Sequence, residues 1–260
     1  MSLWLTLVGF GLFACMAAAW ATQRAAGNAG WVDVFWTFGV GVAGAAAALY
    51  PADDSVAARR WLVAFLALAW AMRLGLHVAR RVARSDEDRR YVDLRAQWGG
   101  RFQPMMFGFL QLQALVSLPL VAAIFLAAHS PRPLGLLDLA GVALLAAAVI
   151  GEGLADAQLD RFKADGDHGP INDRGLWRWS RHPNYFFEWL GWWAYPVIAI
   201  GHPLGWAALV APAVMYAVLV HMTGVPALEK HMAQSRGDAW RRYARRTSAF
   251  PPLPPKGESA

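Results

Sequence analysis

Cysteine is nearly missing from this sequence of 260 residues, because Cys15 is the one example. A single thiol inside an apolar run excludes an internal disulfide and a metal site built from several cysteines. Charged residues are also scarce, at 16%, against about 25% in ordinary soluble domains. A chain of this composition resembles neither a soluble domain nor a disordered one.

Apolar residues are abundant instead, at 57% of the chain, which indicates that lipid surrounds most of it. Trp occurs 14 times, and several copies (Trp4, Trp31, Trp61 and Trp206) lie at the ends of apolar runs, where an indole favours the headgroup layer. The formal charge of +6 is explained by basic residues beside helix ends, so we expect no nucleic-acid partner. The composition predicts an integral, multi-pass membrane protein in contact with membrane lipid.

Seven apolar runs approach the length of about 20 residues that a bilayer crossing needs. They cover 3–22, 31–50, 61–78, 107–128, 136–157, 186–200 and 205–221, of which the sixth is short. We interpret the first as a retained helix, because no Lys or Arg precedes it as in a signal peptide. The sequence therefore predicts an all-α polytopic fold of about seven transmembrane helices, a single domain over 1–260, and a monomer.

The basic residues are unevenly distributed between the two predicted sides of the membrane. Of the 24 Lys and Arg residues, 20 fall on one side, Arg59, Arg60 and Arg132 on the other, and Arg73 within a span. The positive-inside rule then predicts an outer N-terminus and a cytosolic C-terminus. The long loops 79–106 and 158–183 and the tail 222–260 share the cytosolic side, where we expect the active site.

A capping signal lies within the 79–106 loop. Ser85-Asp-Glu-Asp88 has the spacing of a capping box, which predicts a short surface helix that carries Arg89, Arg90 and Tyr91.

Six ionisable residues lie in or at the edge of apolar runs, where a charge costs at least about 2.5–3.5 kcal/mol. They are Asp33, Arg73, His77, Glu152, Asp156 and Glu188. Each falls in the predicted cytosolic half of its span. Buried ion pairs, for instance Asp33 with Arg73, are one explanation, and a hydrated cavity open to the cytosol is the other and favoured one.

Carboxylates continue along the end of the 136–157 run. Glu152 and Asp156 are four residues apart and share a helix face, which Gln158 and Asp160 extend towards the cytosol. Carboxylates next to a dinucleotide commonly accept hydrogen bonds from ribose hydroxyls. A metal is not expected, because the run offers no histidine at helical spacing.

The segment from Gly175 to Glu188 is the densest signal in the chain. Pro183 suits the first turn of a helix, so a helix is predicted to begin near His182. Arg178 and Arg181, just before its free amide groups, predict an anion site for a phosphate. Asn184 and Glu188, four residues apart, are placed to bind a polar head group.

Gly39-Val-Gly-Val-Ala-Gly44 matches the dinucleotide-binding pattern GxGxxG in letters. It lies inside an apolar run with no strand before it, which excludes the Rossmann interpretation. We expect close helix packing through small residues instead.

Three segments resemble the steroid 5α-reductase family, in its bacterial, DUF1295-like branch. They are Trp179-Ser-Arg-His-Pro-Asn-Tyr-Phe-Phe-Glu-Trp189, Asp86-Glu-Asp-Arg-Arg-Tyr91 and Trp31-Val-Asp-Val-Phe-Trp36. Sterol C14-reductases share the Arg-His-Pro-Asn-Tyr segment, and isoprenylcysteine carboxyl methyltransferases share Arg-His-Pro-x-Tyr. The resemblance covers residues 31–252.

This resemblance implies a seven-helix enzyme that holds NADPH and delivers hydride to the β-carbon of an enone, most typically a 3-keto-4-ene steroid. It assigns to the cofactor a set of residues near the cytosolic side: Asp156, Asp160, Lys163, Arg178, Arg181, His182, Asn184, Tyr185, Glu188, Tyr243 and Arg246. Asp156 stands where the family has Asn.

The polarising group for the substrate carbonyl is left open among Asp33, Arg73 and His77. A protonated Asp33 would donate a hydrogen bond to the enolate oxygen, whereas Arg73 would supply charge. The substrate is expected to be hydrophobic and to enter from the bilayer. An S-adenosylmethionine-dependent membrane methyltransferase is the main alternative, and a transporter is the non-enzymatic one, although no inverted repeat is visible.

Overall fold

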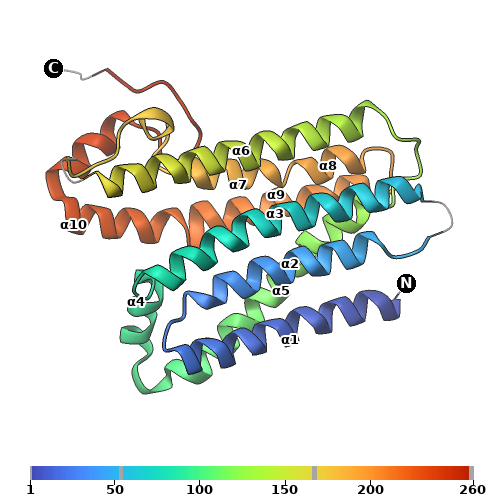
Figure 1. The fold of residues 1–260 in the computed structure, drawn as a ribbon, viewed down its shortest axis with the longest axis horizontal. Coiled ribbons are helices and arrows are strands. Elements are labelled where there is room, and N and C mark those ends of the chain that lie inside the picture. The colour runs from blue at the N-terminus through green and yellow to red at the C-terminus, as the bar shows by residue number, and fades with distance from the viewer. Residues whose placement is uncertain (1, 53–54, 166–168, 258–260) are drawn as a thin grey trace. The chain divides into compact units, whose positions relative to one another are not determined.

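The computed structural model of the chain describes residues 2–52, 55–165 and 169–257. Helices make up 79% of the described residues, which contain no strand (Figure 1). The predicted all-α fold is confirmed. Its α-helices are α1 (Ser2–Ala26), α2 (Trp31–Ala48), α3 (Ala57–Arg84), α4 (Arg89–Trp98), α5 (Phe102–Ala128), α6 (Leu136–Ala164), α7 (Pro183–Gly191), α8 (Ala194–Ala199), α9 (Val210–Tyr216) and α10 (Val225–Arg246). Short helices lie at Gly99–Arg101, Gly175–Arg178 and Gly205–Leu209, and a π-helix at Ala217–Met222.

Six helical stretches of the described chain are long and apolar enough to cross a membrane. They are Thr6–Ala26, Trp31–Ala48, Ala57–Arg84, Arg89–Ala128, Leu136–Ala164 and Gly205–Arg246. The multi-pass membrane protein is thereby confirmed.

The predicted span 186–200 differs from the other six, because it is divided into α7 and α8, and neither half has the length of a span. Pro196 has no N–H to donate to the carbonyl of Trp192, and its ring would clash with that carbonyl in a continuous helix. The chain turns at Trp192 and Trp193 instead.

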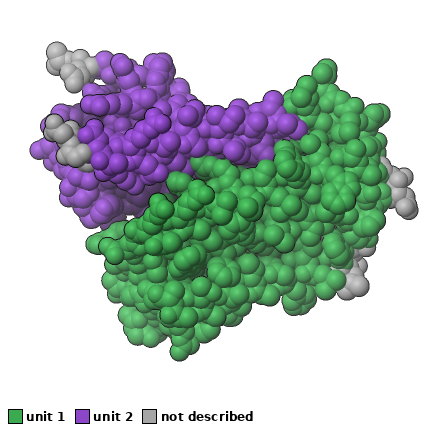
Figure 2. Space-filling view, in the orientation of Figure 1, with its two compact units in different colours: residues 1–140, 195–211 green, residues 141–194, 212–260 purple. Residues whose placement is uncertain are grey.

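The chain forms two compact units, coloured separately in Figure 2. Unit 1 comprises Met1–Ala140 and Tyr195–Ala211, and unit 2 comprises Gly141–Ala194 and Pro212–Ala260. Both units are therefore assembled from segments far apart in sequence, and each is described by itself below.

The glycines of the 39–44 segment let the helices of unit 1 approach closely. A β-carbon on Gly41 would lie 2.2 Å from Cβ of Ala71 in α3, and one on Gly44 would lie 2.5 Å from Cδ1 of Ile124 in α5. The predicted small-residue packing is confirmed, since a larger side chain at either position would push two helices apart.

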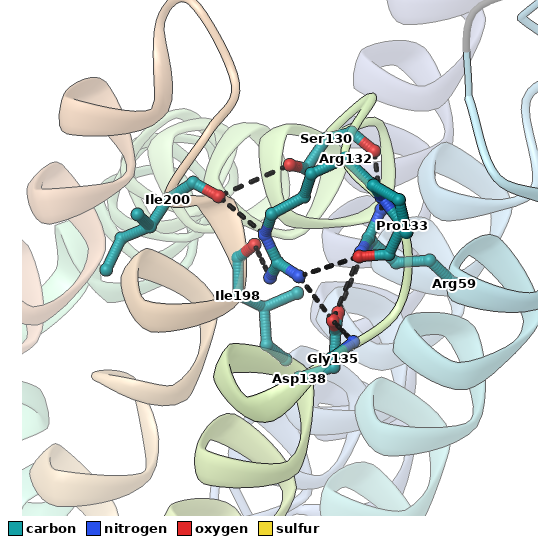
Figure 3. A network of polar contacts seen from close by, with 8 residues as sticks. All are labelled: Arg59, Ser130, Arg132, Pro133, Gly135, Asp138, Ile198 and Ile200. Atoms are coloured by element: carbon teal, nitrogen blue, oxygen red, sulfur yellow. Dashed lines mark hydrogen bonds and ion pairs between the residues drawn. The ribbon is translucent and has the colours of Figure 1, made fainter.

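One end of unit 1 is organised by a guanidinium that is fully buried, Arg59 in the first turn of α3 (Figure 3). Its Nε donates to Asp138 of α6 at 2.7 Å, and its other nitrogens donate to Asp138 and to backbone carbonyls of the α5–α6 connection. Those carbonyls belong to Ser130, Arg132 and Pro133, at 2.6, 2.6 and 2.9 Å. All three guanidinium nitrogens thus have acceptors.

Arg132 extends the same network to α8. It donates to Asp138 at 2.5 Å and to the carbonyls of Ile198 and Ile200 at 3.0 and 2.8 Å. The backbone amide of Gly135 also donates to Asp138, at 2.9 Å. We call Arg59, Arg132 and Asp138 with these carbonyls the Arg59 network. It joins α3, α6 and the end of α8 through one carboxylate (Figure 3).

The short helix predicted within the 79–106 loop is confirmed as α4, but the predicted capping residue is wrong. Asp88 is the N-cap and accepts from the backbone amide of Arg90 at 3.0 Å. Ser85 instead ends α3, where it donates to the carbonyl of Arg81. Burial alone would raise the pKa of Asp88, but hydrogen bonds and charge from Arg90, with the charge of Arg81, outweigh burial and lower it.

Candidate functional site

In unit 2, helix α7 packs against the second half of α6. A β-carbon on Gly151 would lie 2.4 Å from the ring of Phe187, and one on Gly191 would lie 3.2 Å from Leu145. Glycine at both positions therefore lets the two helices pack antiparallel at close range. The pairs also set the register of α6 against α7.

Three acidic residues are buried along this helix pair. Glu152, Asp156 and Glu188 are 5%, 8% and 7% exposed, and we call them the α6–α7 acid set. Asn184 donates from Nδ2 to Asp156 at 3.2 Å, and the indole of Trp192 donates to Glu188 at 3.0 Å. Both donors are neutral. The structure therefore brings Asp156 and Asn184, two of the predicted cofactor residues, into direct contact.

The acid set is not arranged as a shared ligand sphere. No group of three or more His, Cys, Asp and Glu side chains that could hold one metal ion occurs in the part of the chain that the structure describes.

Helix α7 begins where the sequence predicts. His182 is the N-cap residue and Pro183 occupies the first turn. The His182 ring is buried and stacks on Tyr185, with 5.8 Å between centroids and 12° between planes. His182 Nε2 also lies 3.3 Å from Glu229 of α10. His182 and Tyr185 therefore line the start of the helix that carries Asn184 and Glu188.

Arg181, predicted as a phosphate ligand, forms hydrogen bonds with other residues of the protein. Its Nε donates to Glu229 at 2.8 Å, and its Nη1 donates to the carbonyls of Ala244 and Thr247 at 2.8 and 2.7 Å. These carbonyls lie at the C-terminal end of α10, where a cation suits both the orphan acceptors and the helix dipole. Arg181 thus holds α10 against the segment that precedes α7.

Two further predicted cofactor residues, Tyr243 and Arg246, also hold α10 against the segment that precedes α7. Tyr243 is buried and donates to the carbonyl of Trp177 at 2.5 Å, and Arg246 forms an ion pair with Asp173. Three others are exposed, namely Asp160, Lys163 and Arg178. The predicted cofactor residues therefore include some that form contacts with other residues of the protein and some that are exposed.

The segment after α10 lies in the tail 222–260, which the sequence places on the side of the active site without predicting a contact for Ser248 or Phe250. Ser180 donates to the carbonyl of Phe250 at 2.8 Å, and the Arg181 amide donates to the carbonyl of Ser248 at 2.8 Å. The Phe250 ring packs edge-on against Phe186 and Trp189 of α7. Phe250 is an aromatic residue in an otherwise polar and proline-rich tail, and this was the sequence signal that could have predicted its contact with α7.

In unit 1, Asp33 accepts two hydrogen bonds from residues of α4, one from a guanidinium and one from a hydroxyl group. Arg90 Nη2 lies 2.6 Å from one carboxylate oxygen, and the Tyr91 hydroxyl donates to the other at 2.8 Å. Asp33 therefore acts as an acceptor here, not as the donor that the sequence analysis considered. Arg90 and Tyr91 were identified only as surface-helix residues. Arg73 and His77 lie half-buried one turn apart on α3.

The two units offer different chemistry. Unit 2 presents buried acceptors and an amide that match ribose hydroxyls or a carboxamide, with exposed Lys163 and Arg178 for phosphate. Unit 1 presents Arg90 as a multiple donor held on Asp33, which also accepts the one hydroxyl hydrogen of Tyr91.

Comparison with known proteins gives one family. Neither the curated proteins nor the solved structures contain a match to this chain. The profile of a family described as "Protein of unknown function (DUF1295)" matches residues 19–247, which include both units' candidate residues. The chain therefore belongs to the DUF1295 family.

Proposed function

We propose that this protein is a membrane-embedded, NADPH-dependent reductase of a carbon–carbon double bond conjugated to a carbonyl, in a hydrophobic substrate such as a 3-keto-4-ene steroid. The observation that carries the proposal is the α6–α7 acid set with its Asn184 contact, because buried carboxylates beside an amide on one helix pair are groups that suit ribose hydroxyls or a carboxamide. The relation of the DUF1295 family to steroid 5α-reductase-like membrane proteins supports it.

The residues present fit NADPH. Asp156 and Glu188 would accept from ribose hydroxyls or the carboxamide, Asn184 can both donate and accept, and exposed Lys163 and Arg178 would hold phosphate. Arg181, Tyr243 and Arg246 hold the surrounding segments in place instead. When bound, NADPH would supply the hydride.

The substrate carbonyl requires a donor as negative charge develops on its oxygen. Asp33, Arg73 and His77 are the candidates from the sequence, and the contacts of Asp33 add Arg90, whose guanidinium has N–H groups beyond the one donated to Asp33, whereas Tyr91 donates its single O–H to Asp33. We propose that Asp33 acts by fixing Arg90 as the donor. The apolar substrate would enter from the bilayer.

Methyl transfer from S-adenosylmethionine is the second candidate. The contacts of Arg181 favour it, because they remove one cation from the predicted phosphate site, and a smaller cationic cofactor needs fewer basic partners.

The deciding assay follows NADPH oxidation by the purified protein with testosterone or progesterone and seeks the 5α-dihydro product by mass spectrometry. A parallel reaction contains S-adenosylmethionine and a lipid acceptor. Enone-dependent oxidation without methyl transfer supports the reductase. Methyl transfer without NADPH binding would exclude it.

Cofactor binding tests the site itself. NADPH should bind in preference to NADH, because exposed cations favour the additional phosphate. Asn184→Ala and Glu188→Ala should each weaken NADPH binding by about 1–3 kcal/mol. Asn172→Ala is the matched control, since Asn172 is also a buried amide of unit 2. Unchanged NADPH affinity in both site variants would remove α7 from the cofactor site.

We also propose that the cofactor residues face the cytosol of a bacterial inner membrane. In a Cys15→Ala background, single cysteines at positions 55 and 131 should react only from outside, and those at 92 and 236 only from the cytosol. Reaction from the opposite side at any position would overturn this orientation.

A further inference from the structure

Helix α5 ends at a histidine that contacts two backbone carbonyls of unit 1. His129 is the C-cap residue of α5 and is 7% exposed. Its Nδ1 lies 2.8 Å from the carbonyl oxygen of Phe125, one turn earlier in the same helix. Its Nε2 lies 2.9 Å from the carbonyl oxygen of Tyr50, which follows the end of α2. Both ring nitrogens are therefore at hydrogen-bonding distance from an acceptor.

The protonation of the His129 ring decides how many of these hydrogen bonds exist, because a carbonyl oxygen can only accept. A neutral imidazole has one N–H and one bare nitrogen, whose lone pair would face a carbonyl oxygen at 2.8 or 2.9 Å. The imidazolium has two N–H groups and satisfies both carbonyls. The C-terminal end of α5 also favours a cation, because the negative end of the helix dipole lies there. The geometry thus fits the charged ring.

Other ionisable groups face His129 from the elements packed against it. The Tyr50 carbonyl also accepts from Arg60 of α3, at 3.1 Å, and the Tyr50 ring lies 6.4 Å from the His129 ring between centroids. The Arg59 network begins at the residue that follows His129. Burial and the charge of His129 lower the pKa of His202, whose Nδ1 accepts from a backbone amide at 3.0 Å. His202 is therefore held as a neutral ring, and His129 is the histidine placed to take up a proton at this end.

The two carbonyl contacts of His129 differ in how easily they can be broken. The Phe125 carbonyl lies four residues earlier in α5, so the helix itself holds it against the ring. The Tyr50 carbonyl belongs to another segment, and it keeps Arg60 as a donor when the bond from His129 is lost. A neutral ring should therefore keep its hydrogen on Nδ1 and lose the bond to Tyr50.

We propose that His129 is a pH-sensitive switch, whose protonated ring ties the end of α5 to the end of α2 through Tyr50 and whose neutral ring releases Tyr50. Histidine side chains change charge within about pH 5–8, so the Tyr50 contact exists at the acid end of this range and is lost as the pH rises. With the orientation proposed above, this end of unit 1 lies outside, and the switch responds to the pH there. The inference does not depend on the reductase proposal.

The test measures the Tyr50 contact directly, by solid-state NMR of the full chain in lipid bilayers. Histidine carries ¹⁵N and the tyrosine carbonyl carbon carries ¹³C, and the dipolar coupling between His129 Nε2 and the Tyr50 carbonyl is followed. The coupling should be present at about pH 5 and lost at about pH 8, where Nε2 has no hydrogen. Tyr50→Phe is the matched control, because it removes the label from position 50 but keeps the carbonyl, so the coupling should vanish at both pH values.

Thermal unfolding tests whether the contact stabilises the fold. His129→Gln should lower the melting temperature by about 2–4 °C more at pH 5 than at pH 8, because only the protonated parent has the Tyr50 bond to lose. His202→Gln changes the neighbouring histidine and should not show a larger loss in acid. A coupling that persists at pH 8, a coupling absent at pH 5, or an equal loss of melting temperature in His129→Gln at both pH values would overturn the proposal.

Discussion

The Arg59 network and the α6–α7 acid set are both buried and polar, but they differ in the contacts that position their carboxylates. Asp138 lies between two guanidinium groups, and Arg59 has an acceptor for every nitrogen. In the acid set, Asp156 and Glu188 meet an amide and an indole, which are neutral donors. Opposite charges matched at close range hold a fold together, whereas the Asn184 and Trp192 contacts position the carboxylates of Asp156 and Glu188 along the α6–α7 pair.

The largest effect should come from breaking the Arg59 network. Arg59→Met leaves Asp138 buried with fewer donors and should lower the free energy of unfolding by about 3–5 kcal/mol. Thermal unfolding in detergent measures this. Arg60→Met is the matched control, since Arg60 is partly exposed and donates to the carbonyl of Tyr50. Equal melting temperatures of the two variants would show that the network is not structural.

Arg181 can be tested for a structural role like that of the Arg59 network against a role in binding NADPH like the one proposed for the acid set. Lysine cannot reach Glu229 and both α10 carbonyls as the guanidinium does, so Arg181→Lys should cost about 1–3 kcal/mol of stability. The control is Arg178→Lys, at an exposed position. If Arg181→Lys instead weakened NADPH binding and left stability unchanged, Arg181 would be the phosphate ligand that the sequence suggests.

Glu188→Gln tests the acid set without removing the Trp192 contact. In Glu188→Gln the new amide oxygen still accepts from Trp192, so stability should change by less than about 1 kcal/mol. NADPH affinity, measured by titration of the same sample, should fall. A loss of stability as large as that of Arg59→Met would remove the distinction between the two regions.

Acidification should have the smallest effect, at the N-cap of α4. A lowered pKa means that Asp88 contributes stability above its unfolded value of 3.8, and the contribution is lost as pH falls through the lowered pKa. Because Asp88 is partly exposed, the change should stay below about 1 kcal/mol. Asp88→Asn should flatten it, and equal acid sensitivity of variant and parent would contradict this assignment.

The long helices were predictable because an apolar run of sufficient length indicates a helix surrounded by lipid. The prediction of a continuous span over 186–200 was wrong for a local reason. Its hydrophobicity is sufficient, but Pro196 prevents a continuous helix through Trp192. The start of α7 was predictable from Pro183 for the same kind of local reason.

Side-chain partners were less predictable than helices. Asp33 had several cations within reach in principle, and the position of α4 brings Arg90 and Tyr91 to it as hydrogen-bond donors in the structure. Arg178 and Arg181 look equivalent in sequence, yet one is exposed and the other caps α10. Charge type is local information, whereas the choice of partner depends on tertiary packing.

The span in sequence between Arg59 and its acceptors constrains how the protein is made. Asp138 is 79 residues downstream, and the nearest of the backbone carbonyls is 71 residues downstream. At translation rates of about 5–20 residues per second, Asp138 leaves the ribosome roughly 4–16 s after Arg59. During that interval the start of α3 cannot be buried at its final position without an unpaired guanidinium. The N-terminal helices must therefore wait in a provisional arrangement until the beginning of α6 is synthesised.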